Sequence, residues 1–215
     1  MGIKISVVMA SYLGQYTHCA DDRIRKFHRA VNSFIKQNYQ DKELIIVSDG
    51  CSVTINESQK YVGNPNIKLH AIEKQPQFSG NVRNYGCNVA TGDVICYLDT
   101  DDFIGNNHLN QIGLSFQYHN GLDWIYFDDN IIYKFNPTDS NMVLSQLGRD
   151  VKLSFGSIGT SSIAHKRLPD INWIGCNGYG HDWTFIKRLI DLNKPNIKIY
   201  GCQYNVCHIP NSVDC

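Results

Sequence analysis

The most constraining feature of this sequence is an apolar run that ends in a cluster of acids. The residues from Val94 to Leu98 are all apolar or aromatic, and three acids follow: Asp99, Asp101 and Asp102. Such a run predicts a strand buried on both faces, as in a parallel sheet. The carboxylates then lie at the carboxyl end of the strand, the edge at which open α/β sheets bind ligands. They repel one another unless a cation compensates, and Mg²⁺ or Mn²⁺ suits oxygen ligands.

Strand and helix patterns alternate along the first hundred residues. Apolar, β-rich runs predict strands over 3–9, 44–47, 67–71 and 94–98. Apolar residues at three- and four-residue spacing predict helices over 24–35 and 81–90, and a short polar helix is expected over 57–62. This order predicts an α/β fold in which helices flank a mostly parallel central sheet with right-handed crossovers.

The alternation breaks after the fourth strand. We expect helices over 107–118 and 183–190, and strands over 124–127, 131–135, 158–165, 197–200 and 203–207. The segment 136–149 is predicted to be a loop or lid, and the Gly-rich segment 175–182 a loop. A length of 215 residues suits one α/β domain.

Charge and hydropathy narrow the classes of partner. The 20 basic and 20 acidic residues balance, so no global field favours nucleic acid or an anionic membrane. The basic residues from Arg23 to Arg29 are interpreted as a solvated helix face, which leaves a nucleic-acid partner open. The sequence has no transmembrane segment, and its first residues lack the layout of a signal peptide. We therefore expect a cytoplasmic location with reduced thiols.

Three further residues stand where chemistry is expected. Asp49 lies in an Asp-Gly turn directly after the strand 44–47. Arg83 falls in the first turn of the helix 81–90, where an arginine and a helix N-terminus together favour a phosphate, although a plain surface arginine is the alternative. Asp182 follows the Gly-rich loop and either performs chemistry or only caps the next helix.

Four blocks in order along the chain resemble the family 2 glycosyltransferases of the GT-A fold: 5–12, 43–52, 80–102 and 180–183. The resemblance implies one GT-A domain over 1–215, with a nucleotide-sugar-binding half at 1–105 and an acceptor-binding half at 106–215. It implies metal-dependent, inverting transfer of a sugar from a nucleotide diphosphate sugar, with a UDP-sugar favoured. The acceptor hydroxyl is of unknown type: a glycan, a lipid-linked sugar, a protein or a modified nucleobase.

The resemblance also implies which residues bind the donor nucleotide. Ala10, Tyr12 and Asp49 would hold the nucleobase, with Asp49 accepting a hydrogen bond from its imide N–H. Arg83 would contact the nucleotide near its phosphates. Asp99 would face the ribose or the metal.

The metal and the base are assigned in the same way. Asp101, together with Asp99, would ligate the Mn²⁺ or Mg²⁺ that bridges the diphosphate. His208, after the last expected strand, would reach the metal or the diphosphate. Asp182 would be the general base on the acceptor hydroxyl, since a hydroxyl is a poor nucleophile unless a base takes its proton.

Two alternatives to a transferase remain. Asp99-Thr100-Asp101 after an apolar strand also spells the opening motif of haloacid dehalogenase-like phosphatases, but that motif belongs near the chain start and position 103 is Phe. A non-catalytic nucleotide-sugar or glycan-binding module would keep the fold and lose a catalytic acid. Asp99, Asp101 and Asp182 are all present.

Overall fold

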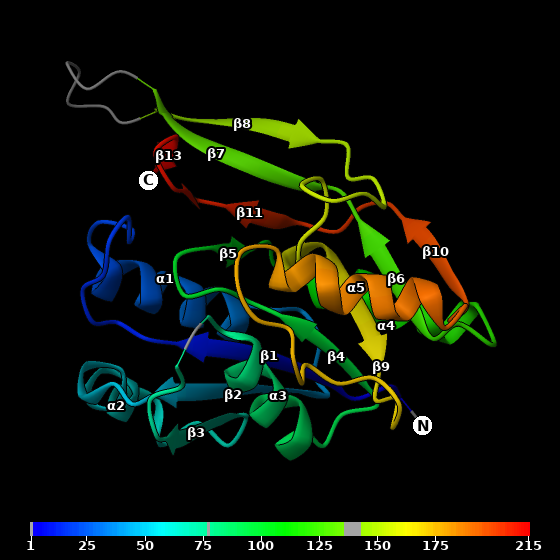
Figure 1. Ribbon diagram of the computed structural model, residues 1–215, viewed down its shortest axis with the longest axis horizontal. Coiled ribbons are helices and arrows are strands. Elements are labelled where there is room, and N and C mark those ends of the chain that lie inside the picture. The colour runs from blue at the N-terminus through cyan, green and yellow to red at the C-terminus, as the bar shows by residue number, and fades with distance from the viewer. Residues whose placement is uncertain (1, 77, 136–142) are drawn as a thin grey trace.

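The computed structural model describes residues 2–76, 78–135 and 143–215. Within these residues the centre is a seven-stranded sheet of order β10-β6-β9-β4-β1-β2-β3 (Figure 1). Its strands are β1 (Ile5–Ser11), β2 (Lys42–Asp49), β3 (Ile67–Ile72), β4 (Val94–Tyr97), β6 (Trp124–Phe127), β9 (Ile163–Lys166) and β10 (Asn196–Ile199). Among these described strands only β9 runs antiparallel to its neighbours. The predicted α/β fold with a mostly parallel central sheet is confirmed.

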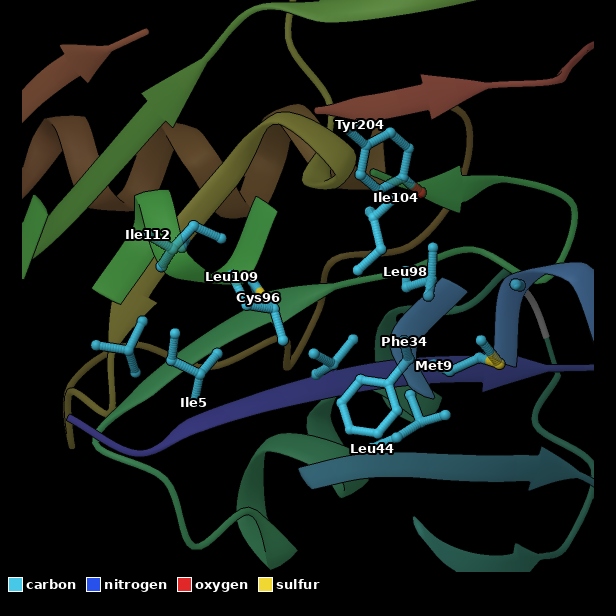
Figure 2. Close-up of a cluster of buried hydrophobic side chains, with 14 of the residues drawn as sticks. Ile5, Met9, Phe34, Leu44, Cys96, Leu98, Ile104, Leu109, Ile112 and Tyr204 are labelled. Carbon is cyan, nitrogen blue, oxygen red and sulfur yellow. The ribbon is translucent and has the colours of Figure 1, made fainter. Parts of the chain in front are cut away.

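Helices cover both faces of the sheet because its strands bury side chains on both sides. The helices are α1 (Arg23–Ile35), α3 (Gly80–Val89), α4 (His108–Tyr118) and α5 (His181–Asp191). Met9 of β1 joins the buried cluster that contains Phe34 of α1 and Leu109 of α4 (Figure 2). Its neighbour Val8 points to the other face and joins the cluster that contains Phe185 of α5. Successive side chains of β1 therefore pack alternately against the helices on the two faces of the sheet.

A second sheet lies at the end of the molecule away from β2 and β3 (Figure 1). Its order is β5-β11-β7-β8, with β5 (Phe103–Ile104), β7 (Asp129–Phe135), β8 (Val143–Arg149) and β11 (Tyr204–Val206). The remaining elements are α2 (Ser52–Ser58), the 3₁₀ turns η1 (Gln59–Tyr61) and η2 (Thr160–Ser162), and the paired strands β12 (His208–Ile209) and β13 (Val213–Asp214).

The predicted loop or lid over 136–149 is wrong for its second part, and residues 136–142 lie outside the described residues. β8 pairs antiparallel with β7 along its whole length. The Nε of Arg149 donates to Asp129 Oδ1 at 2.8 Å and fixes the end of this pair. Gln146, Leu147 and Gly148 are all exposed, so this part of β8 lacks the alternation of buried and exposed residues that indicates a strand in a sequence.

Two other boundaries differ from the prediction, because tertiary contacts decide them. The helix expected over 57–62 begins instead at Ser52, since Thr54 is buried with its hydroxyl 3.0 Å from that of Ser11. The strand expected over 158–165 begins only at Ile163. Ser162, in the preceding 3₁₀ turn, donates from its hydroxyl to Asp129 Oδ2 at 2.8 Å.

The basic side chains of α1 do not form one solvated face, which corrects the interpretation made from the sequence, although Arg25 is exposed. Arg23 and Lys26 are buried. Lys26 forms an ion pair with Asp214, in the last strand of the chain. Arg29 donates from Nη2 to the backbone carbonyl of Asp101 at 2.6 Å. This face of α1 therefore packs against the acid cluster and the C-terminal segment.

Within the described part of the chain, none of the helices combines the length and the apolar character needed to cross a bilayer. All eight cysteines are free thiols. Cys96 is buried in β4, as expected for a small core hydrophobe.

Candidate active site

A cavity of about 850 Å³ opens at the carboxyl edge of the central sheet, within the size range of small-ligand sites. It is lined from the ends of β1, β2 and β4, from the start of α3 and from the start of α5. Seven of the eight predicted site residues line it: Ala10, Tyr12, Asp49, Arg83, Asp99, Asp101 and Asp182. The sheet edge predicted from the sequence is therefore where these residues meet.

Arg83 contacts two of the acids that line this cavity. It lies in the first turn of α3, and only 4% of its surface is exposed, so it is not a plain surface arginine. Its Nη2 donates to Asp99 Oδ1 at 2.8 Å, and its Nη1 donates to Asp182 Oδ1 at 2.9 Å. Burial opposes the charge of Arg83, but the two carboxylates outweigh burial and raise its pKa. One guanidinium therefore joins two acids that lie 83 positions apart in the chain.

Asp182 is held as a carboxylate. It lies in the first turn of α5, after Gly180 in the left-handed region at φ +91°. Burial raises the pKa of Asp182, but the neighbouring charge of Arg83 is the largest opposing cause, and the pKa falls to about 2. Asp182 is therefore ionised at neutral pH and can accept a proton or a hydrogen bond.

His181 also contacts this pair. Its Nε2 lies 2.8 Å from Arg83 Nη1, and its Nδ1 lies 3.2 Å from the carbonyl oxygen of Gly178. The same Nε2 lies 3.0 Å from Asp182 Oδ1. Without a proton, Nε2 accepts from Arg83; with a proton, it donates to Asp182. In either tautomer His181 contacts both members of the Arg83–Asp182 pair.

The buried side chain of Trp173, which stacks on that of Phe185, packs against Arg83. The Cζ of Arg83 lies 5.3 Å from the ring centroid of Trp173, and Trp173 stacks on Phe185 at 4.0 Å between centroids. The Trp173 Nε1 donates to the Tyr97 hydroxyl at 3.0 Å, and that hydroxyl lies 2.7 Å from His165 Nε2. Sequence reasoning missed Trp173 as a support of the site, because it carries no motif and lies far from Arg83 in the chain.

The acid cluster after β4 divides into two groups. Asp102 is buried and accepts hydrogen bonds from the Tyr204 hydroxyl at 2.9 Å and from the Cys207 N–H at 2.8 Å. Burial and the charges of Asp101 and Asp99 raise its pKa well above the usual range. Asp102 therefore anchors β11 to the end of β4, and Asp99 and Asp101 are the two acids of the cluster that line the cavity.

Asp99 and Asp101 fit a divalent cation. Burial and the charge of Asp99 raise the pKa of Asp101, which indicates negative charge that a cation would compensate. No three His, Cys, Asp or Glu side chains of the described residues are grouped closely enough to hold a metal by themselves. Two carboxylates nevertheless suffice for Mg²⁺-type sites in which substrate phosphates and water complete the shell.

His208 has other contacts in this structure. Its Nδ1 lies 3.4 Å from Asp214 Oδ1, and its Nε2 lies 3.1 Å from the carbonyl oxygen of His18. His208 is not among the residues that line the cavity, although Pro210 is. Its proposed role at the metal or diphosphate stays a prediction.

Asp49, Lys74 and Tyr12 form another part of the cavity lining. Asp49 Oδ2 accepts from Lys74 Nζ at 2.5 Å, and Asp49 Oδ1 accepts from the Gln75 N–H at 2.6 Å. The Lys74 ammonium also lies 4.8 Å from the ring centroid of Tyr12. Sequence reasoning missed Lys74, because nothing in the loop after β3 distinguishes it from a surface lysine.

Solved structures share this fold. The chain superposes on *Staphylococcus aureus* TarS 1–349 in complex with UDP-GlcNAc with a TM-score of 0.69 and 17% identity, covering 95% of this chain and 58% of that one. The mannosyltransferase PcManGT from *Pyrobaculum calidifontis*, in complex with GDP-Man and Mn²⁺, gives a TM-score of 0.66 and 10% identity, covering 99% and 59%. The fold is that of the GT-A glycosyltransferases, as predicted.

Sequence matches narrow this class to one family. Residues 22–137 match the family model described as glycosyl transferase family 2. An uncharacterised glycosyltransferase of *Nostoc* sp. is 32% identical over 117 residues, which are 54% of this chain and 33% of that protein. TarS of *S. aureus*, a poly(ribitol-phosphate) β-N-acetylglucosaminyltransferase, is 25% identical over 120 residues, or 54% of this chain and 19% of TarS. The chain belongs to glycosyl transferase family 2 and spans a third or less of these two relatives.

Proposed function

We propose that this chain carries a metal-dependent, inverting glycosyltransferase site that moves a sugar from a UDP-sugar to an acceptor hydroxyl. The observation that carries this proposal is the joint contact of Arg83 with Asp99 and Asp182. It brings Asp99, expected at the donor ribose or the metal, and Asp182, expected at the acceptor, into contact with one buried guanidinium. Family membership and the UDP and UDP-GlcNAc complexes of TarS support the same assignment.

The reaction needs one base and a stabilised leaving group. Asp182 takes the proton of the acceptor hydroxyl while the hydroxyl oxygen forms a bond to the anomeric carbon. The bond from that carbon to the diphosphate oxygen breaks, and the nucleoside diphosphate leaves with the electron pair. Attack opposite to the leaving group inverts the configuration at the anomeric carbon. We propose that the guanidinium of Arg83 stabilises the negative charge that develops on the diphosphate.

Asp101 and Asp99 are the residues proposed to hold the metal. When bound, a divalent ion neutralises the charge of the leaving diphosphate. The complexes of PcManGT with GDP-Man and Mn²⁺ and of GalNAc-T7 with UDP, GalNAc and Mn²⁺ support a divalent ion in this fold.

We expect Asp101→Asn to abolish the gain in UDP affinity that Mn²⁺ gives. Loss of a group that only supports a metal ligand costs roughly 10–100-fold in affinity, so loss of a ligand should cost at least as much. Calorimetric titration of UDP with and without Mn²⁺ measures this effect. Asp22→Asn is the matched control, because Asp22 is an exposed acid directly before α1 and does not line the cavity. Full transfer activity in excess chelator would refute the metal requirement.

Asp49 is proposed to select uracil over a purine. Each of its oxygens accepts one hydrogen bond and keeps a second lone pair, so either oxygen can accept the imide N–H of uracil. The UDP and UDP-GlcNAc complexes of TarS support uracil over guanine, whose two adjacent N–H donors a carboxylate can also bind. Tyr12 would stack on the base, and Ala10 would contact it.

We expect UDP to bind more tightly than GDP or ADP, and Asp49→Asn to weaken UDP binding. A hydrogen bond to a charged group contributes about 1.5–3 kcal/mol, so the loss should be roughly 10–100-fold. Calorimetry with the three nucleotides and Mn²⁺ measures both effects. Tighter binding of a purine nucleotide would overturn the assignment, which matters because the fold also binds GDP-Man in PcManGT.

Slow hydrolysis of the donor separates an enzyme from a binding module. We expect UDP to be released from the correct UDP-sugar in the absence of any acceptor, because water can replace the acceptor hydroxyl. A panel of UDP-sugars with Mn²⁺ identifies that donor. Tight donor binding without turnover, with and without acceptors, would support the non-catalytic module. The cytoplasmic location, the division at residue 105 and the acceptor type stay predictions.

A further inference from the structure

We propose that Tyr179, Phe155 and Phe78 form the acceptor subsite beside Asp182, and that this subsite binds a pyranose ring of a glycan. This inference rests on the proposed function, because it names the substrate class of the same site. It makes a neutral sugar the acceptor, out of the glycan, lipid, protein and nucleobase alternatives that the sequence leaves open.

The three aromatic rings contribute little to the core. Tyr179 is 90% exposed, Phe155 is 66% exposed and Phe78 is 47% exposed. Tyr179 and Phe78 line the same cavity as Asp182. An exposed ring gains little burial energy in folding, so two such rings in the lining of one cavity indicate a binding surface.

The backbone at Phe78 has a conformational cost, and two glycines in the left-handed region flank Tyr179. Tyr179 lies between Gly178 at φ +80° and Gly180 at φ +91°, a conformation that residues with a side chain rarely adopt. A Cβ on Gly180 would lie 2.8 Å from Phe155 Cε2, so the glycine lets the Phe155 ring lie against the loop. Phe78 itself has φ +51°, which is unusual for a bulky residue. Such strain is typical of functional sites.

The rings stand close to the proposed base. The ring centroid of Phe78 is 5.6 Å from that of His181, the residue directly before Asp182. Tyr179 precedes Asp182 by three positions on the same loop. Phe78, Tyr179 and Asp182 line one cavity, so a ligand packed on the two rings shares that cavity with the carboxylate.

A pyranose ring matches this combination of groups. Its C–H face packs on an aromatic ring, while its hydroxyls, which project from the rim, reach a carboxylate. A tyrosine adds a polar tip for a second hydroxyl.

The charges of the cavity disfavour a polyanionic acceptor. Three basic residues belong to the described lining, and each already has a partner. Arg23 donates to a backbone carbonyl, Lys74 pairs with Asp49, and Arg83, proposed above to contact the donor diphosphate, pairs with two acids. None of the three is assigned to the acceptor, so a phosphodiester chain would need a further cation, whereas a neutral sugar does not.

Saturation-transfer NMR with methyl β-D-glucopyranoside and methyl N-acetyl-β-D-glucosaminide tests this proposal, in the presence and absence of UDP and Mn²⁺. We expect transfer to the ring protons of at least one glycoside. Tyr179→Ala and Phe155→Ala should each weaken its binding roughly fivefold to tenfold, as expected for loss of an aromatic contact. Tyr179→Phe should retain most of the affinity because the ring remains.

Tyr118→Ala is the matched control, because Tyr118 is 75% exposed but lies at the end of α4 and does not line the cavity. UDP affinity should be unchanged in all these variants. The subsite would be overturned if neither glycoside binds, or if Tyr179→Ala binds the glycoside as tightly as wild type does. A stronger saturation-transfer signal on a Ser/Thr peptide than on the glycosides would also overturn it. Failure of UDP to bind would instead overturn the proposed function, so the two failures are distinguishable.

Discussion

Replacement of Asp182 by Asn is expected to lower turnover by roughly 10²–10⁴-fold, the usual contribution of a positioned general base. Asn keeps the size of the side chain and can still accept a hydrogen bond from Arg83, but it cannot take a proton. The variant should therefore fold, with some loss of stability because Arg83 loses one charged partner, and should bind UDP and Mn²⁺ as wild type does. Steady-state transfer rates, with product anomers assigned by NMR, measure the effect, and the residual product should still be inverted.

Asp191→Asn is the matched control for this prediction, and His181 is the alternative base. Asp191→Asn removes a second carboxylate from the same helix, but Asp191 is exposed and pairs with Lys187, so turnover should not change. The N-cap of α5 is Gly180, and among the described residues Asp182 makes no capping hydrogen bond, so if Asp182→Asn transfers sugar at a near wild-type rate, Asp182 serves only as a partner of Arg83. His181, which contacts Arg83, would then be the next candidate for the base.

Replacement of Arg83 by Met should have the second large effect, because it leaves Asp99 and Asp182 without their shared partner. Breaking a buried ion pair by removing one member costs about 3–5 kcal/mol. Both carboxylates here retain some contact with solvent, so we expect about 3 kcal/mol. For a chain of this size that loss lowers the melting temperature by about 6–12 °C. Thermal unfolding measures the change, and UDP binding should weaken in parallel.

Arg83→Lys and Arg25→Met are the comparisons for this prediction. A lysine keeps the charge but lacks the planar fork that reaches two acids at once, so it should rescue stability only in part. Arg25 is an exposed arginine of α1 that pairs with Asp22, and its loss should cost at most about 1 kcal/mol. Equal melting temperatures for Arg83→Met and wild type would show that the pair does not stabilise the fold.

The Arg83 contact also predicts how stability depends on pH. The pKa of Asp182 is held at about 2, below its usual value of 3.8. Stabilisation from this group is therefore complete above about pH 4 and is lost as the pH falls towards 2. In Arg83→Met the lowering charge is gone, so the carboxyl pKa should rise, and NMR titration of Asp182 measures that shift.

The sequence by itself determined most of the fold and the edge of the sheet at which the site lies. Apolar runs and helical periodicity are local properties of the chain, so they predicted β1 to β4, α1, α3, α4 and α5 with small errors at the ends. The position of the site at the carboxyl end of β4 was predicted in the same way. An apolar strand followed directly by acids is a local pattern that can be recognised without any tertiary contact. Ala10, Tyr12, Asp49, Asp99, Asp101 and Asp182 followed from motifs, and all six line the cavity.

Tertiary structure alone decided which groups contact one another. The sequence did not show that Arg83 joins Asp99 to Asp182, or that Asp102 turns away to Tyr204. It also predicted a solvated face where Lys26 is buried. Side-chain direction and burial depend on elements that meet only in the folded chain, and periodicity within one element carries no information about its distant neighbours.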